Sequence, residues 1–460
     1  MTSAHLTSTA AQPTTADELA QWIWSADWNA IDEVDVSSVR QALTDVVAVM
    51  IAGSATETSS TLRELYLDRP IGSGVAVSGT RFRASALNAV LLNAYAAHAL
   101  DYDDTIQGLT THPSCHIFPI LHALVGTERH DASVREFLLA YAVGIEVEGR
   151  LARALNPAHA RRGWHTTGSV GTIAAAAAAA KFLGYSAVTV RESLAIACSM
   201  SSGIRANFGS PVKPLHAARA ARNGLEAVLL AGSGFHGGTD PFGHEFGFLR
   251  AYADLPPDAL LGIGKPGWYW LNQLTVKPYP CCGEATALVE AALRVRPQVS
   301  SSDIVDVHLG VTPFAREILE FDRPQNADQA RFSAPYCVAV ALQHGALGIN
   351  SFDEAALSDA RVANRMDSVA IAVDESLPGH GGTVTVRLCS GKSVSASVDI
   401  PKGHASVGMP EADARAKFMD CTGSVLGVDD AETLYASLTA LRDDDLICER
   451  LAALATARPT

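Results

Sequence analysis

Three short polar segments interrupt an alanine-rich, apolar chain, and each stands where a helix is expected to begin. They are Asp101–Thr105 followed by His112-Pro113, Gly163–Thr167 around His165, and Lys213-Pro214. Proline is tolerated in the first turn of a helix, so His112 and Lys213 are expected at helix starts. Helix N-termini present unpaired N–H groups and the positive end of the helix dipole, which suits carboxylates or phosphates. The three segments therefore indicate a pocket for a small acidic molecule.

The composition limits the classes of partner. The 460 residues are 48% hydrophobic and 18% charged, which predicts a large buried core and more than one domain. The formal net charge of −14 argues against nucleic-acid or membrane partners, because a phosphate surface attracts a basic face. The N-terminal segment lacks the basic start and apolar core of a signal peptide, and eight scattered cysteines are expected to stay reduced. We therefore expect a cytoplasmic protein whose ligand-binding cations are local.

The hydrophobic pattern predicts a mainly α fold. Helical periodicity runs to about residue 270, with helices expected at Leu87–Leu100, Val134–Leu155, Thr172–Leu183, Val188–Ser202 and Ala217–Leu230. Strand alternation follows at Asp303–Gly310, Val369–Val373, Gly382–Leu388 and Ser393–Ile400, between helical patterns at Gln329–His344 and Asp353–Ala360. Glu411–Leu454 returns to the helical pattern. The prediction is a large all-helical domain, residues 1–274 completed by 405–460, and a smaller α+β domain, 275–404, inserted before the C-terminal helices.

Seven segments in this order resemble the MmgE/PrpD family. They are His98–Thr105, Thr111–Ser114, Gly163–Thr167, Asn207–Gly209, Lys213–His216 with Ala220–Gly224, Val276–Pro280 and Lys417–Cys421. Activities in that family include 2-methylcitrate dehydratase, cis-aconitate decarboxylase and iminodisuccinate epimerase. The resemblance implies an all-α domain with an α+β lid, a homodimer, and cofactor-free chemistry on small di- and tricarboxylates between the domains.

The resemblance also implies a set of site residues. They are Asp101 and Thr105, which an i, i+4 spacing would place on one helix face, with His112, His165, Lys213, Lys277 and Tyr336. Lysines and imidazoles can stabilise negative charge that spreads from a carbon onto a neighbouring carboxylate, and a histidine can move the proton. We assign His112 and His165 to proton transfer and the two lysines to carboxylate binding. Asp101 would orient a cation or a histidine.

One segment departs from the family pattern. After Lys277 the methylcitrate dehydratases have a short motif that contains a histidine. At that place this chain has Pro280, Cys281, Cys282, a glycine and Glu284. The missing histidine argues against 2-methylcitrate as the substrate. Cys281 and Cys282 are expected to line the substrate pocket, and in an epimerase a cysteine could return the proton on the opposite face.

A metal site is the rival interpretation of the first segment. Asp103, Asp104, His112, Cys115 and His116 are ligand types, and the two histidines have the i, i+4 spacing of a helical zinc pair. The glutamate of that motif is absent, so we expect no metal. The sequence therefore predicts a cofactor-free lyase acting on a small di- or tricarboxylate. The alternatives are an epimerase of an iminodisuccinate-like dicarboxylate and an inactive carboxylate-binding protein.

A carboxylate pocket predicts stabilisation by anions. Citrate should raise the melting temperature more than chloride at equal ionic strength, because a ligand that binds only the folded state stabilises it by mass action. Thermal melts in both salts test this. Equal shifts would contradict the presence of a carboxylate pocket.

Overall fold

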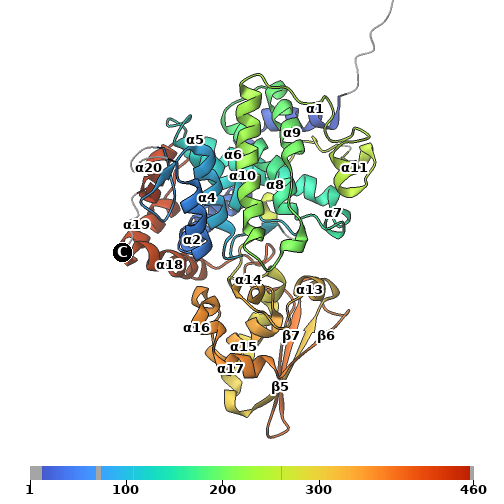
Figure 1. The fold of residues 1–460 in the computed structure, drawn as a ribbon, viewed down its shortest axis with the longest axis vertical. Coiled ribbons are helices and arrows are strands. Elements are labelled where there is room, and N and C mark those ends of the chain that lie inside the picture. The colour runs from blue at the N-terminus through green and yellow to red at the C-terminus, as the bar shows by residue number, and fades with distance from the viewer. Residues whose placement is uncertain (1–12, 69–73, 107, 261, 456–460) are drawn as a thin grey trace, which may run out of the picture.

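The computed structural model describes residues 13–68, 74–106, 108–260 and 262–455, which form a mostly helical fold with three small β-sheets (Figure 1). The predicted domain ends at residues 1 and 460 lie outside these described residues.

The larger of two hydrophobic cores is built from helices. Those before residue 260 are α1 (Thr15–Ser25), α2 (Glu33–Ser54), α3 (Glu57–Tyr66), α4 (Ala86–His98), α5 (Ser114–Val125), α6 (Val134–Leu155), α7 (Ala158–Arg161), α8 (Thr166–Phe182), α9 (Ala187–Met200), α10 (Val212–Gly232) and α11 (Phe248–Ala253). The C-terminal helices α18 (Glu411–Leu426), α19 (Val428–Thr439) and α20 (Ile447–Leu451) return to this core and bury Phe418, Leu434 and Ile447 in it. The alanines at 174–180 in α8 are all fully buried, and their short side chains let neighbouring helices approach closely.

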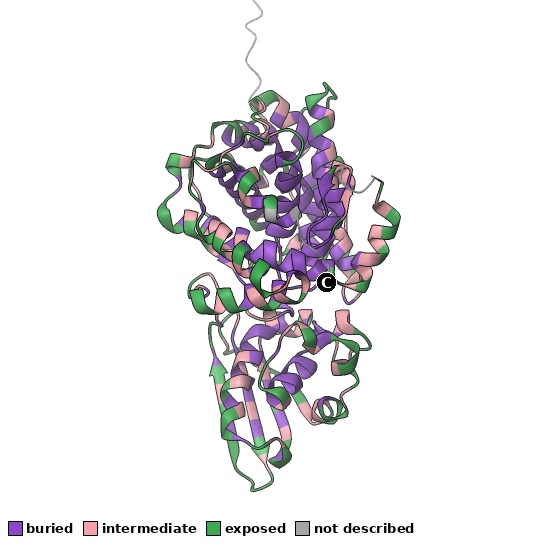
Figure 2. Ribbon diagram, turned by 90° about the vertical axis from the view of Figure 1, so that its left-hand side faces the viewer, coloured by how far each residue is buried: buried purple, intermediate pink, exposed green. Residues whose placement is uncertain are grey.

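The smaller core joins helices to a four-stranded sheet. Its helices are α12 (Thr286–Val295), α13 (Pro313–Ile318), α14 (Ala327–Ala330), α15 (Ala334–His344), α16 (Glu354–Leu357) and α17 (Ala360–Met366). The strands β5 (Ile304–Val311), β6 (Val369–Val373), β7 (Gly382–Leu388) and β8 (Ser393–Val398) are ordered β6-β5-β7-β8. Only the β5–β6 pair is parallel within this sheet of the described chain. Alternate residues such as Val307, Leu309, Val384 and Val386 are buried, and the opposite face is more exposed (Figure 2).

Local sequence signals explain most differences from the predicted elements. The helix predicted at 329–344 is split, because Ser333 caps a new helix with Pro335 in its first turn. The helical pattern predicted from 411 to 454 is broken after Leu426 by Gly427, whose φ of +84° is outside the helical region. Two helices begin earlier than predicted, α8 at Thr166 and α10 at Val212, so polar residues of the motifs enter their first turns.

Helix α2 is the one described helix that is long and apolar enough to cross a membrane by length and composition alone. Most of its residues are buried in the larger core, where α2 packs against α4 and α18. This helix therefore has the character of a central core helix.

Close packing of α2 on α4 predicts a destabilising substitution. A Cβ at Gly53 would lie 1.9 Å from the carbonyl oxygen of Ala96 in α4. Gly53→Ala should therefore cost about 1–3 kcal/mol through backbone displacement and lower the melting temperature. Gly423→Ala in α18 is the matched control, since nothing lies within 4 Å of its Cβ and alanine favours the helix. Equal melting temperatures for the two variants would contradict this packing.

Candidate functional site

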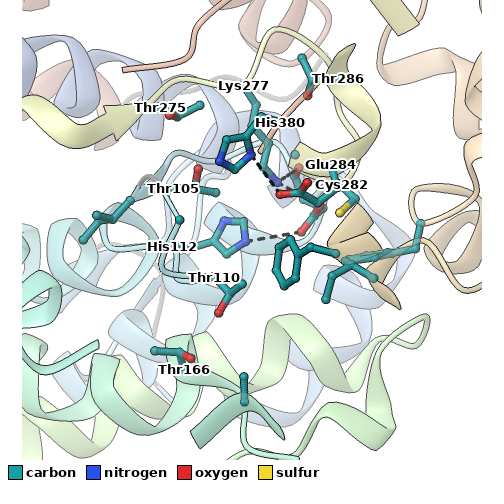
Figure 3. Close-up of a pocket in the computed structure, with 18 of the residues that line it drawn as sticks. Thr105, Thr110, His112, Thr166, Thr275, Lys277, Cys282, Glu284, Thr286 and His380 are labelled. Carbon is teal, nitrogen blue, oxygen red and sulfur yellow. Dashed lines mark hydrogen bonds and ion pairs between the residues drawn. The ribbon is translucent and has the colours of Figure 1, made fainter. Parts of the chain in front are cut away.

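A cavity of about 180 Å³ lies between the two cores (Figure 3). The half that carries the larger core contributes Asp101, Thr105, His112, His165 and Lys213 to its lining. The half that carries the smaller core contributes a second wall, which includes Cys282, Glu284, Phe332, His380 and His404. Lys277 lies in the segment that links the two halves. The volume suits a small metabolite more than a drug-sized ligand, whose sites measure about 300–1,000 Å³.

Asp101 is the centre of the charged groups at this cavity. Its Oδ1 accepts a hydrogen bond from Lys213 Nζ at 2.6 Å, and its Oδ2 accepts one from Lys277 Nζ at 2.9 Å. Lys277 Nζ also donates to the backbone oxygen of Asp101 at 2.6 Å. Asp101 has a φ of +50°, a left-handed conformation that a short polar side chain tolerates better than most. This turn, directly after α4, aims the carboxylate at both lysines.

A two-stranded ladder brings Lys277 to this turn. Strand β3 (Thr105–Ile106) pairs antiparallel with β4 (Leu274–Thr275), with Thr105 opposite Thr275. The hydroxyl of Tyr102 donates to the carbonyl oxygen of Pro278 at 3.1 Å, which holds the chain on the other side of Lys277. Thr105 is therefore on a strand, and the predicted helical spacing from Asp101 to Thr105 is wrong, although both residues line the cavity.

Helix starts position the other predicted residues, as the sequence indicated. His112 precedes Pro113, the N-cap of α5, and His165 is itself the N-cap of α8. Lys213 is the second residue of α10. The backbone N–H of His112 donates to Thr167 Oγ1 at 3.2 Å, so the starts of α5 and α8 are joined directly.

Behind these residues lies a buried pair that sequence reasoning did not assign to the site. His98, the last residue of α4, has its Nδ1 2.9 Å from Asp103 Oδ2 and its Nε2 2.7 Å from Lys213 Nζ. Asp103 Oδ2 also lies 3.4 Å from His112 Nδ1. Asp103 thus lies between two imidazoles and orients that of His98. His216, also unassigned, has its Nδ1 3.1 Å from that of His165.

Burial and neighbouring charges shift the pKa values of the larger-core residues that line the cavity. Burial acts to raise the pKa of Asp101, but Lys213 and Lys277 outweigh it and hold that pKa far below its ordinary value. Burial, with the charge of nearby lysines, lowers the pKa of His112 and of His165. At neutral pH the wall therefore presents two ammonium groups, a carboxylate and neutral imidazoles.

The cavity lining is locally positive in an acidic protein. With histidines counted as neutral, its described residues include five cationic side chains and three carboxylates: Arg161, Arg205, Lys213, Lys277 and Lys402 against Asp101, Glu284 and Glu317. The whole chain has a formal net charge of −14. A local excess of cations in an acidic protein favours an anionic ligand at this place.

Two of the predicted site residues lie outside the described lining. Tyr336 is buried in the smaller core, where its hydroxyl donates to the Ser351 carbonyl at 2.6 Å. Cys281 is fully buried in the same core, whereas its neighbour Cys282 lines the cavity. Of the two cysteines, therefore, only Cys282 is among the described lining residues. Burial raises the pKa of Cys282, which is a protonated thiol at neutral pH.

Two residues of the rival metal set, His116 and Asp104, have other partners. His116 Nε2 lies 2.7 Å from Glu148 Oε2, and Asp104 Oδ2 accepts from Ser114 Oγ at 2.5 Å. Ligand atoms do lie within 4.8 Å of one another in two groups, one of His98, Asp103 and Cys115 and one of His98, Asp101 and His112. The Lys213 ammonium, however, already contacts His98 and Asp101, and its charge would repel a cation. The geometry therefore favours an ammonium-centred site over a metal centre.

Two family models together match most of the chain. Family models described as the MmgE/PrpD N-terminal domain and the MmgE/PrpD C-terminal domain match residues 17–259 and 279–442. The chain belongs to the MmgE/PrpD family. It is 30% identical over 371 residues to the cis-aconitate decarboxylase of Homo sapiens, which covers 77% of this chain and 76% of that protein.

Two fungal relatives match nearly the whole chain. The cis-aconitate decarboxylase-like protein oryM of Aspergillus oryzae is 27% identical over 472 residues, or 95% of this chain and 96% of that protein. The cis-aconitate decarboxylase of Aspergillus terreus is 24% identical over 468 residues, or 94% and 95%.

The ammonium-centred geometry predicts metal-independent catalysis. Dialysis against EDTA should leave activity unchanged, because Lys213 and Lys277 supply the positive charge that a metal would otherwise provide. The measurement is the rate before and after chelation, with added zinc as the second arm. Loss of activity on chelation and recovery with zinc would instead assign His98, Asp101 and His112 as ligands.

Proposed function

We propose that this chain is a lyase that removes CO2 from a small unsaturated tricarboxylate of the cis-aconitate type. One observation carries the proposal: Lys213 and Lys277 converge on Asp101 at a locally positive cavity in an otherwise acidic chain. The names of the relatives supply the substrate class, since the human and fungal proteins are cis-aconitate decarboxylases or decarboxylase-like.

The proposed reaction moves electrons within the substrate and needs no redox partner. The bond between the departing carboxylate and its carbon breaks, and its electron pair forms a new C=C bond. The former C=C pair then takes up a proton at the far carbon, so that one proton is consumed for each CO2 released. Negative charge passes onto a remaining carboxylate during this shift. Ammonium groups fixed beside the remaining carboxylates bind the substrate and offset this charge in both the ground and transition states.

Each residue of the larger-core wall has a role in this account. Lys213 and Lys277 bind the remaining carboxylates, while Asp101 fixes the two ammonium groups in place. His112 and His165 are neutral in the empty site and act as hydrogen-bonding groups toward the substrate. The proton-transfer role predicted for them from sequence would require the substrate's negative charge to raise their pKa. The half with the smaller core would act as a lid, because it supplies the opposite wall of the cavity.

An epimerase of an iminodisuccinate-like dicarboxylate is the second candidate. The observation in its favour is that Cys282 lines the same cavity as His112 and His165. Its thiol is protonated at neutral pH and could return a proton on the face opposite to a base. An epimerase would exchange substrate hydrogen with solvent without loss of carbon, and this outcome separates it from a lyase.

A time course of NMR spectra in heavy water tests the proposal. With cis-aconitate we expect CO2 release and one deuterium on a product carbon. Solvent exchange into iminodisuccinate without CO2 would support the epimerase, and loss of water from methylcitrate would identify a dehydratase. If none of these substrates reacts and all of them still bind, the chain is a carboxylate-binding protein and the lyase proposal is wrong.

Kinetic defects should differ between the lysines and the histidines. Lys213→Met should mainly raise KM, because this lysine holds a carboxylate in both the ground and transition states. His165→Gln and His112→Gln should mainly lower kcat, by about a hundred-fold, if their interaction with the substrate forms in the transition state. Exposed Lys392→Met is the matched lysine control, and melting temperatures report folding. Normal kinetics in all three site variants would contradict the assignment.

A further inference from the structure

The second wall of the cavity carries a histidine and a carboxylate that the roles above leave unused. His380 lies in the loop between β6 and β7, and Glu284 follows Cys282 in a short 3-10 helix, Gly283–Ala285. His380 Nδ1 is 3.3 Å from Glu284 Oε1. Figure 3 shows His380 and His112 facing the same cavity, His380 from the smaller-core half and His112 from the larger-core half. Histidines from both halves of the chain therefore line this cavity.

The surroundings of His380 differ from those of the imidazoles across the cavity. The carboxylate of Glu284 raises the pKa of His380 and outweighs the opposing effect of burial. On the other wall, burial and the nearby lysines lower the pKa of His112 and His165. The other titratable groups of the lining near His380 are His404, whose ring lies 5.5 Å away, and Lys402 and Lys277.

Where the surroundings raise the pKa of one group in a site and lower that of another, the first group is the candidate acid and the second the candidate base. A decarboxylation that ends with protonation of carbon needs an acid. The larger-core wall presents neutral imidazoles, while Glu284 favours the imidazolium form of His380. Of these lining histidines, the one whose carboxylate partner favours the protonated form therefore lies on the smaller-core wall.

We propose that His380 is the catalytic acid that protonates the substrate carbon, and that Glu284 is a positioning residue for it. This inference rests on the proposed lyase function and names the source of the proton. The C=C electron pair of the substrate takes a proton from the imidazolium while the bond to the departing carboxylate breaks. CO2 leaves, His380 becomes neutral, and water returns the proton for the next turnover. Because Nδ1 faces Glu284, Nε2 delivers the proton.

In this arrangement one wall binds the carboxylates and the other donates the proton. Lys213 and Lys277 hold the carboxylates on one side, and the proton arrives from the other side. Protonation is then directed to one face of the substrate, so deuterium from heavy water should enter the product with a single stereochemistry.

The test compares His380→Gln and Glu284→Gln with the wild type across pH, using the cis-aconitate decarboxylation rate. His380→Gln should lower kcat by about a hundred-fold or more with little change in KM. The fall in kcat as pH rises through the pKa of the acid should disappear in this variant. Glu284→Gln should keep substantial activity but move that fall to lower pH, because the carboxylate that raises the pKa of His380 is gone.

A matched control exists outside the cavity. His344 forms a similar pair with Asp359, with 3.2 Å between Nε2 and Oδ2, and is not among the described lining residues. His344→Gln should leave kcat and its pH profile unchanged. A structural role for His380 would lower the melting temperature and raise KM without moving the pH profile.

The outcomes separate the inference from the function on which it rests. If the wild type decarboxylates and His380→Gln keeps wild-type kcat and pH profile, His380 is not the acid and the lyase proposal stands. If the fall at high pH disappears only in His112→Gln, the proton comes from the larger-core wall and the inference is wrong. Absence of decarboxylation in the wild type overturns the lyase proposal and this inference together.

Discussion

The contact of one buried carboxylate with two buried ammonium groups organises this site. Asp101, Lys213 and Lys277 are each nearly inaccessible to solvent, so none could carry its charge there without the others. Their contact requires the end of α4, the start of α10 and the segment after β4 to meet at one point. The left-handed turn at Asp101 directs the carboxylate at that point. The two lysines, with the other cationic side chains of the cavity lining, favour an anionic ligand.

The two halves of the fold contribute different chemistry because their surroundings differ. Burial and the nearby lysines keep the imidazoles of the larger-core half neutral, although the Asp103 carboxylate acts to raise the pKa of His112. The smaller core places a glutamate beside His380, which favours the charged form. Contacts that hold the halves together also reach the site: Arg331 Nε donates to the Leu100 carbonyl at 3.1 Å, next to Asp101. Movement of the smaller core would therefore change both the wall of the cavity and the support of its central turn.

Sequence reasoning located those site residues that local signals mark. His112, His165 and Lys213 lie at helix starts. Proline and polar residues within a few positions of a helix start predict it from the sequence alone. The sequence predicts Thr105 on a helix, whereas it lies on a strand. That strand forms only by pairing in the β3–β4 ladder with a segment about 170 residues away, which no local pattern indicates. Tyr336 and Cys281 are expected at the pocket from the sequence, but the structure buries their side chains in the smaller core. His98 begins one of the segments that resemble the family, but its place behind the site depends on its contacts with Asp103 and Lys213. His380 has no local signal, since its loop becomes part of the site only through tertiary contacts.

The most direct test of this account is a crystal structure with propane-1,2,3-tricarboxylate, a saturated analogue that cannot lose CO2 by the same route. The account predicts one carboxylate within hydrogen-bonding distance of Lys213 Nζ and Lys277 Nζ, with the carbon chain extending toward His380. A ligand bound outside the cavity, or one whose carboxylates avoid both lysines, would contradict the central claim that the Asp101-centred ammonium pair is the substrate site.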